Sequence, residues 1–290
     1  SRRAALTWLA VASLAFYGWW SPVYLWLIGA SIGFNFGLGT RIGALAGTPR
    51  GKALMVAGVA VNLAALGWFK YANFLLDSVN RLSDTGLRLA AITLPVGISF
   101  FTFQQIAYLV DAFRGETKEY DLVDYTLFVT FFPQLIAGPI VHHKEMLPQF
   151  TRKGDGLLRS RDLAVGLTIL AMGLFKKVAL ADNAANYASP VFKAADSGVA
   201  VGFGDAWIAA LAYSMQLYFD FSGYSDMAIG LGRIFGIRLP LNFHSAYKAT
   251  SVVHFWRRWH MTLSRFLRDY LYIPLGGNRH GDVARYRNLF

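Results

Sequence analysis

Cysteine is absent from the 290-residue sequence. Its absence excludes disulfide bonds, thiolate nucleophiles, iron–sulfur clusters and zinc sites built on cysteine. The sequence also lacks the Gly-Lys-Ser/Thr end of a phosphate-binding loop and the His-Glu-x-x-His motif of zinc peptidases. An ATP-driven pump and a helix-borne zinc site are therefore not indicated, and we predict neither a bound cofactor nor a bound metal.

Charged residues are scarce as well. Asp, Glu, Lys and Arg make up 16% of the sequence, whereas a soluble domain carries about 25%. Hydrophobic residues reach 55%, which is typical of a polytopic membrane protein. The net charge of +11 comes from basic residues between the apolar runs. The positive-inside rule explains that pattern, so nucleic acid is not predicted as a partner.

Long apolar runs define the predicted fold, because a transmembrane helix needs about 20 such residues. The runs predicted to span the membrane are Ala4–Trp20, Pro22–Leu38, Ala53–Leu76, Leu94–Phe113, Leu163–Ala181 and Trp207–Phe235. The run Leu122–Val141 contains Pro133 and Gly138-Pro139, which predicts a broken or re-entrant segment. The run Val252–Ile273 is apolar on one side only, as in an amphipathic interfacial helix.

These runs predict an all-α integral membrane protein, a polytopic helical bundle with a broken or re-entrant segment and amphipathic interfacial helices. We expect residues 1–290 to form a single membrane-embedded domain, cut at both ends from a longer chain. The basic loops place the N-terminus in the cytoplasm. If Leu122–Val141 spans fully, or if Trp207–Phe235 forms two short spans, the orientation of the later part is reversed.

Two carboxylates, Asp220 and Asp226, lie inside a predicted span. A charge at the centre of a membrane helix costs about 2.5–3.5 kcal/mol, so each needs a partner or a function. Asp220 and Ser222 are candidates for the wall of a polar cavity. The structural alternative is an ion pair with an arginine such as Arg233, or a bent helix whose polar groups are satisfied by its neighbours. The two interpretations weigh equally for Asp220, and the structural one is favoured for Asp226.

Other polar and small residues in these runs have structural interpretations. Gln104 and Gln105 are predicted to form hydrogen bonds between helices, and Lys176 and Lys177 to reach lipid headgroups. The pair His142-His143 is assigned to a solvated interfacial loop rather than to a metal site. Helix packing explains the glycines that recur every four residues, Gly29, Gly33, Gly37, Gly39, Gly43 and Gly47, and also the pair Gly230 and Gly232.

The candidate catalytic residue is His260, in the stretch Phe255-Trp-Arg-Arg-Trp-His-Met-Thr-Leu-Ser264. A continuous helix would place it on an apolar stripe with Val253, Trp256, Leu263, Leu267 and Leu271, opposite His254, Arg258, Thr262, Arg265 and Asp269. The arginines would then face water or headgroups. A buried neutral imidazole can accept a proton from a hydroxyl. Taken alone, a histidine on an apolar helix face is more often a packed core residue than a catalyst.

Several ordered blocks resemble the membrane-bound O-acyltransferase family, in particular its bacterial alginate O-acetyltransferase and teichoic acid D-alanyl transfer branches. The blocks are Leu94-Pro-Val-Gly-Ile-Ser-Phe-Phe-Thr-Phe103, Phe131-Phe-Pro-Gln-Leu-Ile-Ala-Gly-Pro-Ile140, Tyr218-Phe-Asp-Phe-Ser-Gly-Tyr-Ser-Asp-Met-Ala-Ile229, Leu239-Pro-Leu-Asn-Phe243, the stretch around His260, and Arg268-Asp-Tyr-Leu-Tyr-Ile-Pro274. The resemblance covers residues 94–274 and is strong because the blocks occur in order.

The resemblance implies transfer of an acyl group, an acetyl group here, from a cytoplasmic thioester donor to hydroxyls of an exported polysaccharide. The donor would be acetyl-CoA or an acyl carrier, and extracytoplasmic proteins of the same acetylation pathway would be partners. It implies a site in a tunnel, with His260 as proton acceptor and with Asp220, Ser222, Asn242, Trp256 and Trp259 along the tunnel. Arg257 and Arg258 would meet the anionic donor or lipid headgroups. The expected location is the bacterial inner membrane.

One family feature is missing from this sequence. The family carries a histidine in a Trp-His-Gly-like motif, which does not occur here and is expected after residue 290. His260 would then be the second of two catalytic histidines. The alternatives are D-alanyl transfer from a carrier protein to teichoic acid, a transporter or flippase that uses Asp220 and His260 as a proton relay, and a purely structural subunit.

Overall fold

The computed structural model describes residues 2–83, 86–87, 89–90, 92–117, 121–136, 138–151, 159–279 and 281–289. Throughout these ranges the chain consists of helices and connecting loops, which confirms the predicted all-α fold. The chain divides into two compact units. The first unit holds the described residues of 1–136, 140–153 and 265–290, and the second holds those of 137–139 and 154–264.

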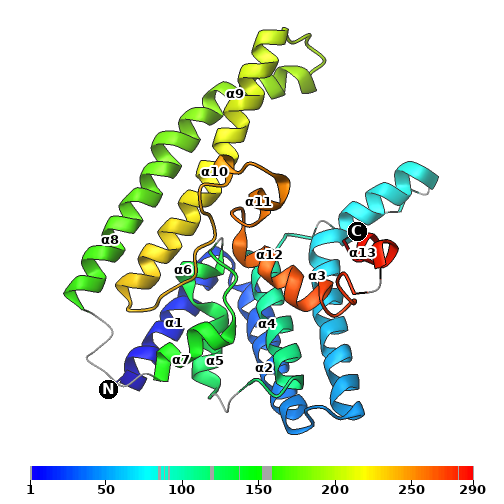
Figure 1. Cartoon of the computed structure of the whole chain (residues 1–290), viewed down its shortest axis with the longest axis vertical. Helices are drawn as coiled ribbons and strands as arrows, with labels where there is room; N and C mark the ends of the chain where they lie inside the picture. Colours follow the sequence, from blue (N-terminus) through cyan, green and yellow to red (C-terminus); the bar gives the residue numbers. More distant parts are fainter. Residues whose placement is uncertain are drawn as a thin grey trace. The chain divides into compact units, whose positions relative to one another are not determined.

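The first unit is a group of packed helices (Figure 1). Its helices are α1 (Arg2–Trp20), α2 (Val23–Ala44), α3 (Pro49–Ser83), α4 (Ile98–Phe113), α5 (Leu122–Thr130), α6 (Phe132–Leu135), α7 (His143–Thr151), the π-helical turn η3 (Arg268–Tyr272) and α13 (Gly281–Leu289). Helices α2, α3 and α4 pack against one another, and α1 packs against α5. The largest fully buried side chains of this unit include Tyr125, Phe128 and Phe131.

The second unit is built on a long helical hairpin. Its elements are α8 (Ser160–Phe175), the π-helical turn η1 (Lys176–Ala181), α9 (Asp182–Asp196), α10 (Phe203–Ile234), the 3₁₀ turn η2 (Ala246–Lys248), α11 (Val252–Trp256) and the start of α12 (Met261–Leu267). Figure 1 shows α10 running back along α8 and α9. Because α10 is one continuous helix, the alternative of two short helices in Trp207–Phe235 is wrong.

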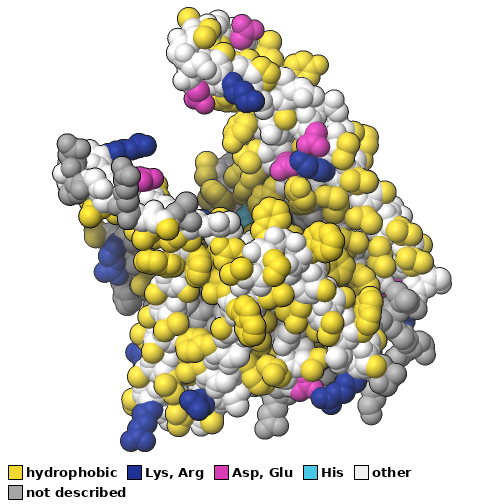
Figure 2. All heavy atoms as spheres, turned by 180° about the vertical axis from the view of Figure 1, so that it is seen from behind, with side chains coloured by type: hydrophobic (Ala, Val, Ile, Leu, Met, Phe, Trp, Pro, Cys, Tyr) yellow, Lys and Arg dark blue, Asp and Glu magenta, His cyan; other side chains and the backbone are white. Residues whose placement is uncertain are grey.

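Three helical stretches in the described part of the chain are long and apolar enough to cross a membrane: Val23–Ala44, Pro49–Ser83 and Ser160–Asp196. They overlap the predicted spans Pro22–Leu38, Ala53–Leu76 and Leu163–Ala181. Hydrophobic side chains cover much of the face shown in Figure 2, and Trp19, Trp26 and Phe203 are more than 80% exposed. The other predicted spans, the membrane orientation and the single-domain organisation remain predictions.

The predicted break in Leu122–Val141 is confirmed. Helix α5 starts at Asp121, whose carboxylate accepts hydrogen bonds from the backbone N–H groups of Val123 and Asp124 at 2.8 and 3.0 Å. It ends at Phe131, where the backbone leaves helical geometry before the short α6. Gly97, at the start of α4, has φ of 70°, and a Cβ there would lie 2.5 Å from the carbonyl oxygen of Leu135. Only glycine fits this contact.

Glycines allow α8 and α10 to approach closely. A Cβ on Gly173 would lie 2.7 Å from the carbonyl oxygen of Gly223, and a Cβ on Gly230 would lie 2.7 Å from that of Gly166. Small residues of this kind let helix backbones touch in a membrane. The predicted packing role of Gly230 is therefore confirmed.

The repeated glycines of α2 behave differently. A Cβ on Gly39 would collide with the ring of Tyr108, but those on Gly29, Gly33 and Gly37 would meet nothing within 4 Å among the described residues. The packing interpretation is thus confirmed for Gly39. At Gly29, Gly33 and Gly37 no described residue packs closely enough to require glycine.

Replacing Gly173 with valine should lower the free energy of unfolding by about 1–3 kcal/mol, because the new side chain meets helix backbone that has no room to move. Thermal unfolding of the purified protein in detergent measures the effect. Gly33→Val is the matched control, since it brings the same change in helix propensity at a position where the added Cβ has no described neighbour within 4 Å. Equal shifts for the two variants would contradict the close packing of α8 and α10.

Candidate functional site

The side chain of Asn242 is fully buried and holds His260 in place. Its Oδ1 lies 3.0 Å from His260 Nδ1 and also accepts hydrogen bonds from the hydroxyl and the backbone N–H of Thr262, at 2.9 and 3.3 Å. Its Nδ2 donates to Ser225 Oγ at 3.1 Å. The amide therefore connects α10 to the segment that carries His260.

The backbone at His260 is unusual. Its φ is 44°, in the left-handed region that non-glycine residues rarely adopt. Such a conformation costs about 1–3 kcal/mol and persists only where the surroundings impose it. Here the backbone N–H of Met261 donates to the carbonyl oxygen of Asn242 at 2.9 Å, so it takes a partner 19 residues away in place of a helical one.

The predicted continuous helix over Val252–Ile273 is therefore wrong. Helix α11 ends at Trp256, the chain turns through residues 257–260, and α12 begins at Met261. The two predicted faces are also lost. Val253, Trp256, Leu267 and Leu271 of the apolar stripe are more than 40% exposed, and Thr262 of the polar face is buried. Hydrogen bonds to Asn242 outweigh the helical periodicity of this segment.

The contact with Asn242 fixes the chemistry of the imidazole. Oδ1 of an amide is an acceptor only, so His260 Nδ1 carries the proton and donates to it. The other nitrogen, Nε2, then holds a lone pair. Burial lowers the pKa of His260 from its ordinary 6.5 to about 4, so the ring is neutral at pH 7. The geometry presents a proton acceptor of defined orientation.

Aromatic rings surround this imidazole. Phe221 meets the His260 ring edge-on with centroids 4.9 Å apart, and Phe243 stacks on it at 6.3 Å. Trp259 packs edge-on against Phe243 at 5.1 Å and stacks on Phe255 at 5.5 Å. These rings lower the local dielectric and explain the direction of the pKa shift.

The predicted tunnel residues occupy different environments. Asn242 and Trp259 lie beside His260 as described above. Ser222 is fully buried on α10, whereas Trp256 is 53% exposed. Asp220 forms an ion pair with Lys177, with Nζ and Oδ1 2.7 Å apart. Whether these residues line a tunnel remains a prediction.

Ion pairs account for the charges along the hairpin. Asp226 pairs with Lys176 at 2.5 Å, and Lys177 also contacts Asp182 at 2.7 Å. The predicted extension of the two lysines to headgroups is wrong, since both pair with carboxylates. The suggested partner Arg233 is wrong as well, because Arg233 pairs with Asp162 at 2.7 Å.

The two candidate donor-binding arginines differ. Arg257 is exposed. Arg258 is half-buried, and its Nε donates to His254 Nε2 at 2.8 Å. The prediction was that Arg258 faces water or headgroups, but its Nε instead binds a neighbouring side chain of the protein. A donor-binding role for either residue remains a prediction.

A second polar cluster lies in the first unit. The Tyr270 hydroxyl donates to Asp111 Oδ2 at 2.8 Å, and His142 Nδ1 lies 3.0 Å from the same hydroxyl oxygen. The guanidinium of Arg265 donates two hydrogen bonds to the carboxylate of Glu145, of 2.5 and 2.9 Å. His143 is 1% exposed, so the predicted solvated loop at His142-His143 is wrong. Gln105, predicted to bond between helices, does so by donating to Ser31 Oγ at 3.0 Å.

Comparison with known proteins identifies the family. The model of the membrane-bound O-acyltransferase family matches residues 59–290. The chain belongs to the membrane-bound O-acyltransferase family. It is 46% identical to a peptidoglycan O-acetyltransferase of Helicobacter pylori, an alignment that covers 97% of this chain and 58% of the relative.

Other relatives support the same family. A probable alginate O-acetylase of Pseudomonas aeruginosa is 46% identical over 97% of this chain and 54% of its own length. A teichoic acid D-alanyltransferase of Streptococcus thermophilus is 30% identical over 62% of this chain and 44% of its own. The chain thus spans little more than half the length of the peptidoglycan and alginate acetylating relatives.

Sequence reasoning missed several residues that bind the candidate site residues or form the second polar cluster. Ser225 and Thr262 bind Asn242; both lie in blocks that resemble the family, but the sequence does not show which of their neighbours they contact. Asp111 and Tyr270 were equally missed. A carboxylate inside the predicted span Leu94–Phe113 was an available signal, of the same kind that drew attention to Asp220.

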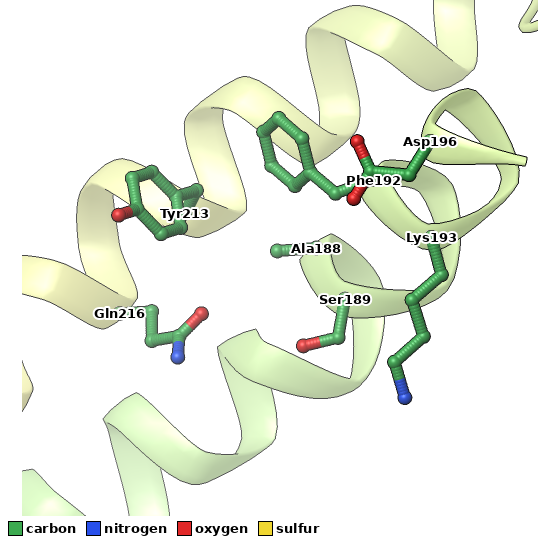
Figure 3. Close-up of a pocket in the computed structure, with 7 residues that line it drawn as sticks. All are labelled: Ala188, Ser189, Phe192, Lys193, Asp196, Tyr213 and Gln216. Atoms are coloured by element: carbon green, nitrogen blue, oxygen red, sulfur yellow. The ribbon is translucent and has the colours of Figure 1, made fainter. Parts of the chain in front are cut away.

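A separate shallow pocket of about 480 Å³ lies between α9 and α10. It is lined by Ala188, Ser189, Phe192, Lys193, Asp196, Tyr213 and Gln216, with the rings of Phe192 and Tyr213 on one wall (Figure 3). The predicted site residues are not among those that line it. No group of three His, Asp or Glu residues suited to a metal occurs within the described ranges.

Replacing Asn242 with leucine should lower the free energy of unfolding by about 3 kcal/mol or more, because three hydrogen-bond donors lose their acceptor in a buried site. Thermal unfolding in detergent measures this loss. Asn183→Leu is the control, since Asn183 is exposed on α9. A loss no larger than that of the control would contradict the central position of Asn242.

Proposed function

We propose that this chain is the core of a membrane O-acyltransferase that moves an acetyl group from a cytoplasmic thioester donor to hydroxyls of an exported polysaccharide. The observation that carries the proposal is the His260–Asn242 pair, a neutral imidazole with a fixed free nitrogen in a family defined by O-acyl transfer. The names of the peptidoglycan and alginate acetylating relatives support a polysaccharide acceptor and an acetyl group.

The proposed reaction follows from the chemistry of the residues present. An acceptor hydroxyl attacks the thioester carbonyl, and its proton passes to His260 Nε2 as the new C–O bond forms. The C–S bond then breaks, and the imidazolium returns the proton to the leaving sulfur as a thiol. The rings of Phe243 and Trp259 limit water near the imidazole, which would otherwise compete with the acceptor.

Donor, partners and location complete the proposal. The donor is acetyl-CoA or an acyl carrier, which Arg257 and Arg258 meet through their positive charge. Extracytoplasmic proteins of the same acetylation pathway receive or position the acyl group. The protein is a multi-pass protein of the bacterial inner membrane, where apolar helices such as α2 and α3 cross the bilayer.

D-alanyl transfer to teichoic acid is the less favoured function. The relative with that name matches 62% of this chain at 30% identity, against 97% at 46% for the acetylating relatives. Family membership also disfavours a transporter without covalent chemistry, since a transporter would move its substrate without consuming an acyl donor.

Replacing His260 with alanine should reduce the rate of acyl transfer to polysaccharide about a hundredfold or more, because a general base contributes about that much. The measurement follows thioester consumption and polymer acetylation together in proteoliposomes. His244→Ala is the control, as His244 is exposed. If the His260 variant transfers acyl groups at the full rate, this residue has no part in the reaction.

The rate of acyl transfer should fall at low pH with the shifted pKa of His260. The reacting form is the neutral ring, which is lost only as the pH falls through about 4. The rate should therefore be insensitive to this group between pH 6.5 and about 5 and fall below that. Asn242→Asp should move the acid limb to higher pH, because a carboxylate stabilises the imidazolium. An unmoved limb in that variant would exclude His260 as its origin.

A further inference from the structure

Three hydrogen-bond donors converge on one oxygen beside His260. Asn242 Oδ1 lies 3.0 Å from His260 Nδ1, 2.9 Å from the hydroxyl oxygen of Thr262 and 3.3 Å from the backbone nitrogen of Thr262. An amide oxygen has two lone pairs, so the three donors compete for them. At the other end of the amide, Nδ2 lies 3.1 Å from Ser225 Oγ.

The chemistry of the groups fixes the direction of each bond. The backbone N–H of Thr262 can only donate, so the amide atom that faces it is the oxygen of Asn242. An amide oxygen can only accept, so the Thr262 hydroxyl and His260 Nδ1 both donate to it. The amide nitrogen can only donate, so the hydroxyl oxygen of Ser225 accepts from it.

These bonds lie in a setting where each one affects the next. Asn242, Ser225 and Thr262 are 0%, 1% and 2% exposed, so bulk water neither replaces nor screens the bonds between them. Buried hydrogen bonds that share a group polarise one another by about 10–30% per bond. A further donor to Oδ1 therefore weakens the bond that this oxygen accepts from His260, whereas an acceptor for Nδ2 makes Oδ1 a better acceptor.

We propose that Thr262 and Ser225 are positioning residues that act on His260 through Asn242 and set its strength as a base in opposite directions. The Thr262 hydroxyl competes with the imidazole N–H for Oδ1, which makes the protonated ring less stable. Ser225 strengthens Oδ1 as an acceptor, which makes the protonated ring more stable. The inference rests on the proposed function, in which a weaker base forms a more acidic imidazolium that returns its proton more readily to the leaving sulfur.

Charged neighbours offer no other control of this base. The other ionisable groups on the segments packed around His260 have partners or are exposed: Asp220 and Asp226 pair with lysines, Arg258 binds His254, Tyr218 packs on Phe243 and Trp259, and Arg257 and His244 are exposed. Burial is the cause that lowers the pKa of His260. A change in that pKa in variants that keep the ring buried therefore reports on the bonds of Asn242.

The test measures the pKa of His260 by ¹⁵N NMR of histidine-labelled variants. Thr262→Val keeps the size of the side chain and removes the hydroxyl, so the pKa of His260 should rise by about 0.3–0.5, a change of roughly two- to threefold in proton affinity. Ser225→Ala removes the acceptor for Nδ2, so the pKa should fall by a similar or smaller amount. Thr262→Ser keeps the hydroxyl and should leave the pKa unchanged.

Opposite signs separate this role from a structural one. A loosened site would admit water and raise the pKa of His260 in Thr262→Val and Ser225→Ala alike, because water relieves the desolvation that lowers it. Thr168→Val is the matched control, since the exposed Thr168 hydroxyl binds only a carbonyl of its own helix among the described residues. Any pattern other than a rise in Thr262→Val and a fall in Ser225→Ala, such as shifts of one sign or no shift, overturns the proposal.

Acyl transfer in proteoliposomes separates this proposal from the proposed function. If His260 is the base, the acid limb of the transfer rate should move with the measured pKa in each variant, and KM for the thioester donor should stay the same. An acid limb that stays in place while the pKa moves as expected supports the action of Thr262 and Ser225 on His260 but removes His260 from the reaction. A wild-type protein that transfers no acyl group overturns the proposed function, and the pKa values still decide the role of the two hydroxyls.

Discussion

The hydrogen bond between His260 and Asn242 is the interaction on which the site depends. It decides which imidazole nitrogen is free, and the other bonds of Asn242 hold Thr262 and Ser225 in place around it. The same residue supplies the backbone carbonyl that binds Met261 and stabilises the left-handed turn at His260. Local strain of about 1–3 kcal/mol is thus offset by a set of buried hydrogen bonds, as is common at functional sites.

In both units, polar side chains inside apolar helices are paired with one another. In the second unit, Lys176 and Lys177 pair with Asp226 and Asp220 across the hairpin. In the first unit, Asn35 and Asn62 exchange two hydrogen bonds, of 3.1 and 2.7 Å, between α2 and α3. Polar side chains whose hydrogen bonds and charges are satisfied by one another can remain inside a membrane helix, where an unpaired polar group would be costly.

The sequence predicted the helices well because a hydrophobic run of span length leaves few alternatives, as in α2, α3 and α10. It also predicted a break within Leu122–Val141, since Pro133 and Gly138-Pro139 act locally, although it did not place the break at Phe131. It failed at His260, where a partner 18 residues earlier, Asn242, overrides the helical period. It found the charges inside the hairpin but not their partners, because pairing across two helices depends on a register that one sequence does not contain. The cluster of Asp111, Tyr270 and His142 was missed for the same reason: its members are far apart in the chain.

The most direct measurement is ¹⁵N NMR of the histidine-labelled protein, with His260→Gln used to assign the ring signals. Near the ordinary histidine pKa of 6.5, the account predicts a neutral His260 with its proton on Nδ1 and a lone pair on Nε2, because burial lowers its pKa to about 4. A ring that is charged at that pH, or that carries its proton on Nε2, would contradict the central claim.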